Sequence, residues 1–165
     1  MKKLMLAAGI VSFAAMSLSA SDENPGHAAA NEHLSVRPES VQWGPAPPSL
    51  PPGAQMAVLV GDPGKAGPYV ARAKLPDGYR VPPHWHPTDE NVTVLQGTFL
   101  IGEGDTFDAS KLESLPAGSF MHMPKTMRHF ATTKGETIIQ LHGAGPFEIN
   151  YVKPADDPRR EKAPN

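Results

Sequence analysis

Cysteine is absent from the 165 residues of this chain. Its absence excludes disulfide bonds, thiolate catalysis, thiolate metal ligands and attachment to a membrane through a lipid-modified cysteine. A basic cluster is also missing, and 15 Lys and Arg against 17 Asp and Glu give a formal net charge of -2. Nothing in this balance indicates a nucleic acid as a partner. After the first 20 residues, no apolar run is long enough to span a bilayer.

The first 20 residues, MKKLMLAAGIVSFAAMSLSA, have the composition of a secretory signal peptide. Two lysines precede an apolar stretch of small and branched side chains that ends in small residues. We expect cleavage near Ala20 and export by the general secretory route, because the charged region contains no arginine pair. The mature protein is expected to be periplasmic or secreted, with no membrane association after cleavage.

The rest of the chain divides into three segments by composition. Residues 21–55 are rich in proline and polar residues and predict an extended N-terminal arm, with Trp43 as its candidate anchor. Residues 56–153 contain short apolar runs between turn signals, which is typical of an all-β barrel or double sheet. Residues 154–165 form a polar C-terminal tail. The one helix candidate is DASKLESL, residues 108–115.

Two histidines and a carboxylate occur at metal-ligand spacing in GYRVPPHWHPTDENVTVLQG, residues 78–97. Alternate side chains of an extended strand face the same way, so His84 and His86 point to one side. The turn-forming residues after them allow Glu90, which begins the next strand-like run, to fold back toward the imidazoles. His129, on a later strand, is the candidate fourth ligand. Three imidazoles and one carboxylate suit Fe, Mn, Zn, Ni or Cu better than Ca or Mg.

Part of this segment resembles the first sequence motif of the cupin superfamily without a departure. The matching residues are Gly78, His84, His86, Glu90 and Gly97. A later segment is similar to the second cupin motif through Gly118, Pro124 and His129. In that segment Thr126 stands where the family usually has glycine, and Thr133 stands where it often has asparagine.

The resemblance covers residues 57–152 and is to small single-domain cupins of the ChrR-like and acetylacetone-dioxygenase-like type. It implies a cupin double-stranded β-helix, a jelly-roll barrel, and it implies that homodimers are common. The metal ligands that the resemblance implies are His84, His86, Glu90 and His129.

A metal held by three histidines and one glutamate keeps open coordination positions, which is a catalytic arrangement rather than a structural one. We expect a dioxygenase-type oxidoreductase that acts on a small dicarbonyl, phenolic or acidic substrate, with Glu90 as the candidate catalytic base. Two alternatives stay open. One is a non-oxidative isomerase, lyase or decarboxylase, and the other is a protein that binds a metal or a small ligand without turnover.

Gln140 and His142 alternate in the run TIIQLHG and therefore share one face of an otherwise apolar strand. They are candidate substrate-binding residues if that face lines the barrel, and they are exposed to solvent if it does not. His122 lies between two methionines and is expected on a strand surface or in a satisfied core position. His27 and His33 lie in the polar N-terminal arm and are expected to be solvated.

Overall fold

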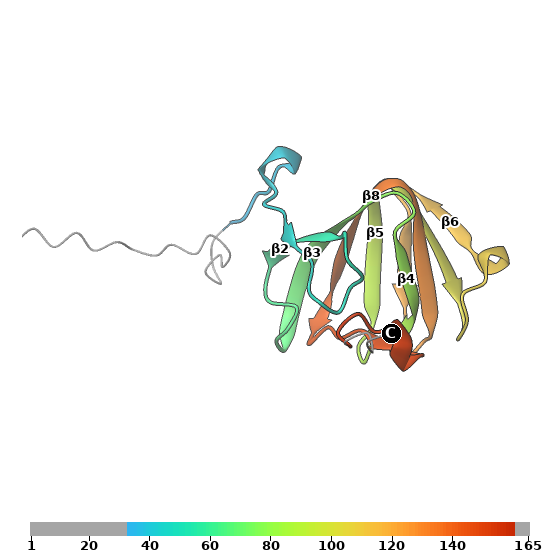
Figure 1. The fold of residues 1–165 in the computed structure, drawn as a ribbon. Helices are drawn as coiled ribbons and strands as arrows, with labels where there is room; N and C mark the ends of the chain where they lie inside the picture. The colour runs from blue at the N-terminus through green and yellow to red at the C-terminus, as the bar shows by residue number, and fades with distance from the viewer. Residues whose placement is uncertain (1–32, 161–165) are drawn as a thin grey trace, which may run out of the picture.

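The computed structural model describes residues 33–160, and the expected signal peptide of residues 1–20 lies outside this part of the chain. The all-β prediction is confirmed (Figure 1). The strands are β1 Gly44–Pro45, β2 Gln55–Val60, β3 Gly67–Leu75, β4 Arg80–Trp85, β5 Glu90–Glu103, β6 Glu113–Pro116, β7 Phe120–Met123, β8 His129–Gly145 and β9 Asn150–Tyr151. Short 3₁₀ turns are η1 Pro38–Ser40, η2 Ala109–Lys111 and η3 Pro154–Asp156. Between residues 33 and 160, no helix is long and apolar enough to cross a membrane.

Two long antiparallel strands, β5 and β8, form the centre of the sheet. They pair along most of their length, and the register shifts on both sides of Gln96. At this point Gly97 has a positive φ of 73°. A Cβ atom on Gly97 would lie 2.4 Å from the carbonyl oxygen of Glu136, so the bend requires a residue without a side chain.

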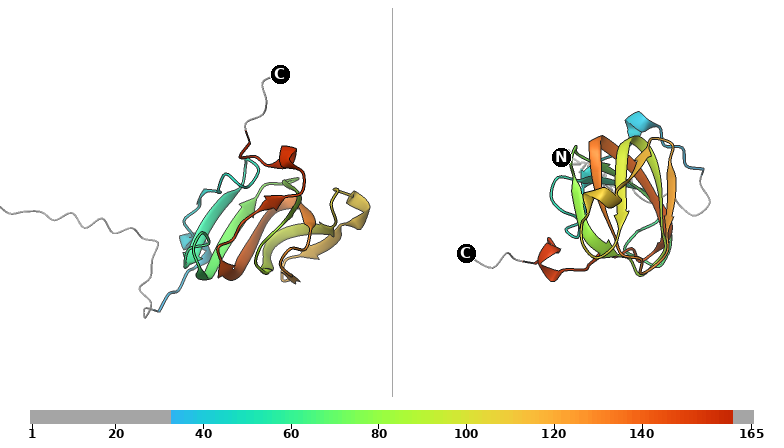
Figure 2. Two further views of the ribbon diagram at one scale, coloured as in Figure 1. Left: turned by 90° about the horizontal axis from the view of Figure 1, so that it is seen from below. Right: turned by 90° about the vertical axis from the view of Figure 1, so that its right-hand side faces the viewer.

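The bend divides each long strand between two halves of one curled sheet. The C-terminal half of β8 pairs with β3, and β2 and β1 follow outward. The N-terminal half of β8 pairs with β4, which in turn pairs with β9. On the other side, β5 pairs with β7 through its first residues and with β6 through its last. The sheet therefore curls round on itself, as the two views of Figure 2 show.

Alternate residues of each strand fill the interior, as the period of a strand requires. On β3 the buried residues are Tyr69, Ala71, Ala73 and Leu75. On β5, Val92 and Val94 are 0% and 1% exposed, whereas Leu95 is 41% exposed. This part of β5 has apolar residues on both faces, but only the face of Val92 and Val94 is buried.

The helix predicted for residues 108–115 is a single 3₁₀ turn followed by a strand. Asp108 accepts hydrogen bonds from the backbone N–H and the hydroxyl of Ser110, at 2.9 and 2.7 Å, which starts the turn. Glu113–Pro116 then pairs with β5 as strand β6. The candidate helix of one or two turns is therefore limited to this one turn, because pairing with an available strand edge satisfies backbone groups that a longer isolated helix leaves unpaired at its ends.

The described part of the N-terminal arm lies against the barrel. Strand β1 pairs with β2, and Nζ of Lys74 on β3 lies 4.5 Å from the centre of the Trp43 ring. A cation over an indole face is a favourable contact, so Trp43 helps to anchor the arm. The arm therefore contributes to the same folded unit as the strands.

Candidate metal centre

Strands β4 and β8 bring three histidines together inside the barrel. His84 lies in β4 and His86 directly follows it, whereas His129 begins β8 and pairs with His84 across the two strands. The three residues are only 5%, 2% and 2% exposed. Their candidate ligand atoms all lie within 4.8 Å of one another, so the group could hold a metal ion. The structure thus brings together the three histidines that the sequence singled out.

Each of the three imidazoles is oriented by a backbone carbonyl. The pairs are Nδ1 of His84 with Pro82 at 2.7 Å, His86 with Glu148 at 2.7 Å and His129 with Met127 at 3.1 Å. A carbonyl only accepts hydrogen bonds, so Nδ1 carries the proton and Nε2 of the neutral ring keeps a free lone pair. Metal-ligating histidines are held in this way.

The fit to a metal is supported by one atom in particular. Nε2 of His86 is buried and has no hydrogen-bond partner among the described residues. A buried polar atom without a partner is unfavourable, and a bound metal ion would provide one. Because the donors are nitrogen atoms, the group suits a divalent transition metal.

Glu90, the first residue of β5, adds a carboxylate beside two of the rings. Its Oε2 lies 3.4 Å from Nε2 of both His86 and His129, an ion-pair distance longer than a normal hydrogen bond. Burial alone would raise the pKa of this carboxyl, but the contacts with His129 and His86 lower it well below its usual value. Glu90 is therefore ionised, and a buried negative charge requires a nearby positive group, either a ring proton or a metal ion.

The rings of the site differ in how readily they take up a proton. Burial, followed by the neighbouring His129 and His86, lowers the pKa of His84 well below its usual value. For His86, burial lowers the pKa, but the carboxylate of Glu90 raises it by more, so the pKa is raised overall. His84 therefore stays neutral, and able to ligate, at lower pH than His86.

A segment of the N-terminal arm that we call the strap, residues 46–51, is held on the barrel by two phenol groups. The hydroxyl of Tyr79 donates to the carbonyl of Pro51, and the hydroxyl of Tyr151 donates to that of Ser49 at 2.7 Å. Each bond contributes about 1 kcal/mol of net stability. The strap therefore has a fixed position beside the site.

The three rings and Glu90 line a small cavity of about 50 Å³. Its other lining residues are apolar, and they include Leu50 of the strap and Phe147. The ring of Phe147 stacks on that of His86, with 4.4 Å between ring centres. Since a water molecule occupies about 30 Å³ of the liquid, the cavity has room for one or two water molecules. An apolar lining strengthens electrostatic interactions at the rings because it excludes further water.

Gln140 and His142 lie on the opposite face of β8 from the cavity. The cavity-lining residues of this part of β8 are Ile139 and Leu141, and in the described chain Gln140 and His142 are not among the lining residues. Gln140 instead accepts a hydrogen bond of 3.1 Å from Nε of Arg72. The apolar pair fills the interior, and strand alternation then turns the polar pair outward. The structure does not place these two residues where the substrate-binding prediction requires them.

Two further histidines, His33 and His122, lie away from the centre. His27 falls outside the described residues. His122 is exposed, and its Nδ1 lies 2.9 Å from Oδ1 of Asn91. His33 is exposed and contacts the hydroxyl of Ser35 at 3.1 Å. His33 is therefore exposed as expected, and of the two locations expected for His122, a strand surface or a satisfied core position, the structure shows the surface.

Two threonines that depart from the cupin motif are both accommodated by hydrogen bonds. Thr126 has a positive φ of 66°, the conformation that favours glycine, and its N–H donates to the carbonyl of His86 at 2.8 Å. The hydroxyl of Thr133 donates to Pro76 at 2.6 Å and accepts from the N–H of Tyr79 at 2.9 Å. The turn before His129 therefore keeps the glycine-like conformation without a glycine.

Contributors to the site that were not found from the sequence include Leu50, Phe147 and the carbonyl of Glu148. They come from the strap and from the segment between β8 and β9. Leu50 and Phe147 contribute apolar surface to the wall of the cavity. Glu148 contributes its backbone carbonyl, a group that every residue has. No side-chain pattern signals such contributions, so a sequence without a structure offers no means to identify them.

Comparisons with known proteins agree with this architecture. A family model described as a domain of unknown function, DUF4437, matches residues 36–163. No curated protein matches the sequence. Among solved structures, the chain is similar to the polyketide cyclase RemF from Streptomyces resistomycificus, with a TM-score of 0.64 and 17% identity over 77% of this chain and 90% of that one.

Two further solved structures show the same likeness. One is a protein from Methylibium petroleiphilum PM1 named as a candidate acetylacetone dioxygenase, with a TM-score of 0.59 and 18% identity over 81% of this chain and 90% of that one. The other is an RmlC-like cupin from Shewanella frigidimarina NCIMB 400, with a TM-score of 0.52 and 18% identity over 68% of this chain and 90% of that one. At these identities the likeness shows the fold, which is the cupin jelly roll.

Proposed function

The chain belongs to the DUF4437 family, whose function is unknown, and we propose that it is a metal-dependent cupin enzyme of the dioxygenase type. One observation carries the proposal: three buried histidines have Nδ1 tied to backbone carbonyls and candidate ligand atoms close together. Rings held in this way need little reorientation to bind a metal ion. The description of the Methylibium protein supports the same reaction class.

His84, His86 and His129 would hold the metal, with Glu90 as the fourth ligand. When bound, a divalent Fe, Mn, Zn, Ni or Cu ion would polarise a carbonyl or phenol oxygen of the substrate, and a redox-active metal would also support reaction with dioxygen. A small dicarbonyl, phenolic or acidic substrate fits this chemistry because it offers oxygen donors to the metal.

The protein groups have separate roles in this proposal. Glu90 would balance the charge of the metal, and as an ionised carboxylate beside the rings it is also the candidate base for a substrate proton. The carbonyls that bind Nδ1 keep the rings in one tautomer. Leu50 and Phe147 exclude water from the reacting end of the substrate.

The test combines metal analysis with an oxygen-uptake assay on the iron-loaded mature protein. Pentane-2,4-dione is the first substrate, and His86→Ala and His33→Ala are the test and control variants. We expect oxygen uptake in the wild type and in His33→Ala, and none in His86→Ala. Conversion without oxygen uptake would favour the non-oxidative alternative, and metal binding without conversion would favour a binding role. Failure of the wild type to bind any of the five metals would refute the proposal.

We also propose that the protein acts after export, because of the signal-like residues 1–20. N-terminal sequencing of the exported protein is expected to begin near Ser21. A mature protein that retains residues 1–20 would contradict this proposal.

The homodimer expected from the cupin resemblance also remains a proposal. Val58 and Val60 on β2 support it, since they are 43% and 45% exposed. Light scattering is expected to give twice the monomer mass, and a monomer at micromolar concentration would contradict the expectation.

A further inference from the structure

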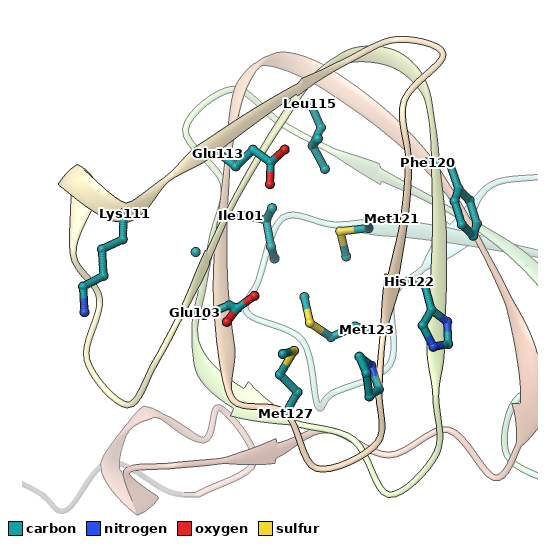
Figure 3. Close-up of a pocket in the computed structure, with 12 residues that line it drawn as sticks. Ile101, Glu103, Lys111, Glu113, Leu115, Phe120, Met121, His122, Met123 and Met127 are labelled. Atoms are coloured by element: carbon teal, nitrogen blue, oxygen red, sulfur yellow. The ribbon is translucent and has the colours of Figure 1, made fainter.

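A second hollow lies on the open edge of the barrel between β6 and β7 (Figure 3). We call it the side pocket, and its volume is about 360 Å³. Apolar side chains from β5, β6, β7 and the turn after β7 form part of its lining, and charged and polar side chains form the rest; the apolar residues include Ile101, Leu115, Met121, Met123 and Met127. The side pocket is larger than the cavity at the histidines and has no role in the metal centre described above.

The side pocket adjoins the cavity at the histidines. Ile101 and Met121 line both spaces, so these two side chains stand between them. Met121 is half-buried, and its unbranched thioether adapts to different neighbours more easily than a branched side chain does. A ligand that spans both spaces therefore requires the adaptable Met121 side chain to move aside.

The two volumes differ in what they can hold. Ligand sites usually measure about 300–1,000 Å³, and they combine an apolar lining with a few polar groups. The cavity of about 50 Å³ is too small for more than the metal-binding end of a ligand, whereas the side pocket of about 360 Å³ lies in the usual range. A substrate larger than a few atoms must therefore extend beyond the cavity.

We propose that the side pocket binds the apolar body of the substrate while its oxygen-bearing end lies at the histidines. This inference rests on the proposed function and specifies the substrate class. The substrate is an amphipathic molecule with paired oxygen donors at one end and a hydrocarbon or aromatic body at the other.

The rim of the side pocket narrows this class further. Glu103 and Glu113 point their carboxylates toward the pocket in Figure 3, whereas Lys111 points away from it. Carboxylates accept hydrogen bonds and repel anions. The two carboxylates therefore favour hydroxyl donors at the outer end of the substrate.

Two diketones with the same metal-binding end test the inference. Pentane-2,4-dione has no body, and 1-phenylbutane-1,3-dione adds a phenyl ring. Both are titrated by calorimetry into the zinc-loaded protein, because zinc is redox-inert and prevents oxidative turnover. Zinc content is measured before and after each titration. Burial of the ring in an apolar pocket predicts that the phenyl probe binds about tenfold more tightly or better.

Matched variants locate the ring. Leu115→Asn places a polar group in the side pocket, and Leu95→Asn places the same group on the exposed outer face of β5. We expect Leu115→Asn to remove most of the preference for the phenyl probe and Leu95→Asn to retain it. Met127→Gln is a second pocket variant with a similar expectation, in case Leu115→Asn does not fold.

The outcomes separate this inference from the proposed function. Equal affinities of the two probes for the wild type would overturn the side-pocket inference and leave the metal site intact. A preference that persists in both folded pocket variants would also overturn it, since the ring would then lie elsewhere. Failure of both probes to bind the zinc-loaded protein would overturn the proposed chelation of paired oxygens, and the inference with it.

Discussion

Metal binding by the three buried histidines should stabilise the fold, and removal of one of them should abolish this effect. The perturbation is His86→Ala, measured with and without added zinc. His86 is 2% exposed, and its Nδ1 bonds to the carbonyl of Glu148. The substitution itself therefore costs about 1–3 kcal/mol, because that carbonyl loses its partner. For this reason, the quantity to compare is the change that zinc produces within each variant.

The size of the effect follows from linkage between binding and folding. A metal present at 1,000 times its Kd adds about 4.1 kcal/mol to the free energy of unfolding. The structure describes residues 33–160 as the folded unit. For a unit of this size, 1 kcal/mol corresponds to roughly 3–5 °C in Tm. We therefore expect zinc to raise the Tm of the wild type by roughly 12–20 °C, and that of His86→Ala by much less.

The assay is thermal unfolding followed by circular dichroism, with His142→Ala as the control. His142 is a histidine of the same barrel whose side chain lies outside the cavity, so its variant should retain the full zinc-induced rise. A similar rise in wild type and His86→Ala would refute the assignment of the metal to this group. Loss of the rise in His142→Ala would show that zinc stabilises the protein at another place.

Three further predictions test the centre and its scaffold. Metal content after dialysis should fall as pH is lowered from about 8 to about 5, because a protonated ring does not ligate a metal. The carboxylate of Glu90 raises the pKa of His86 despite its burial, so this ring takes up a proton readily. Full metal content at pH 5 would contradict the prediction. Gly97→Ala should lower the free energy of unfolding by about 2 kcal/mol or more. Gly135 has a similar φ of 74°, but a Cβ atom there would have no described atom within 4 Å, so Gly135→Ala should lower the free energy of unfolding by about 1 kcal/mol. Equal losses in urea unfolding would refute the close approach at Gly97. Tyr79→Phe should cost about 1 kcal/mol and speed proteolysis of the strap, and an unchanged cleavage rate would contradict its anchoring role.

Sequence reasoning identified His84 and His86 because their signal is local, whereas His129 lies on a later strand and was assigned through the resemblance to the second cupin motif. His84 and His86 lie two residues apart on an extended segment, and strand geometry alone places them on one side. Glu90 follows a turn, and its return toward the rings requires only that the chain reverse direction. The structure brings this carboxylate within 3.4 Å of two rings. Identity and spacing of the residues were sufficient in these cases.

The same reasoning could not predict whether Gln140 and His142 face the interior of the barrel. Strand alternation correctly indicates that they share a face, but it does not say which face of β8 points inward. The barrel interior accepts the apolar Ile139 and Leu141, and the polar pair then faces outward. The helix candidate in residues 108–115 is only one turn long for a related reason, since the edge of β5 was available for pairing.

The sequence by itself determined the all-β architecture, the likeness to cupins and the identity of the candidate ligands, because alternation, turn residues and ligand type are properties of short segments. Only the tertiary structure decided that Leu50 and Phe147 line the cavity, that backbone carbonyls set the tautomers of the rings and that a side pocket adjoins the centre. These features depend on which distant segments become neighbours. That arrangement is decided by the packing of the whole chain, for which a short segment carries no signal.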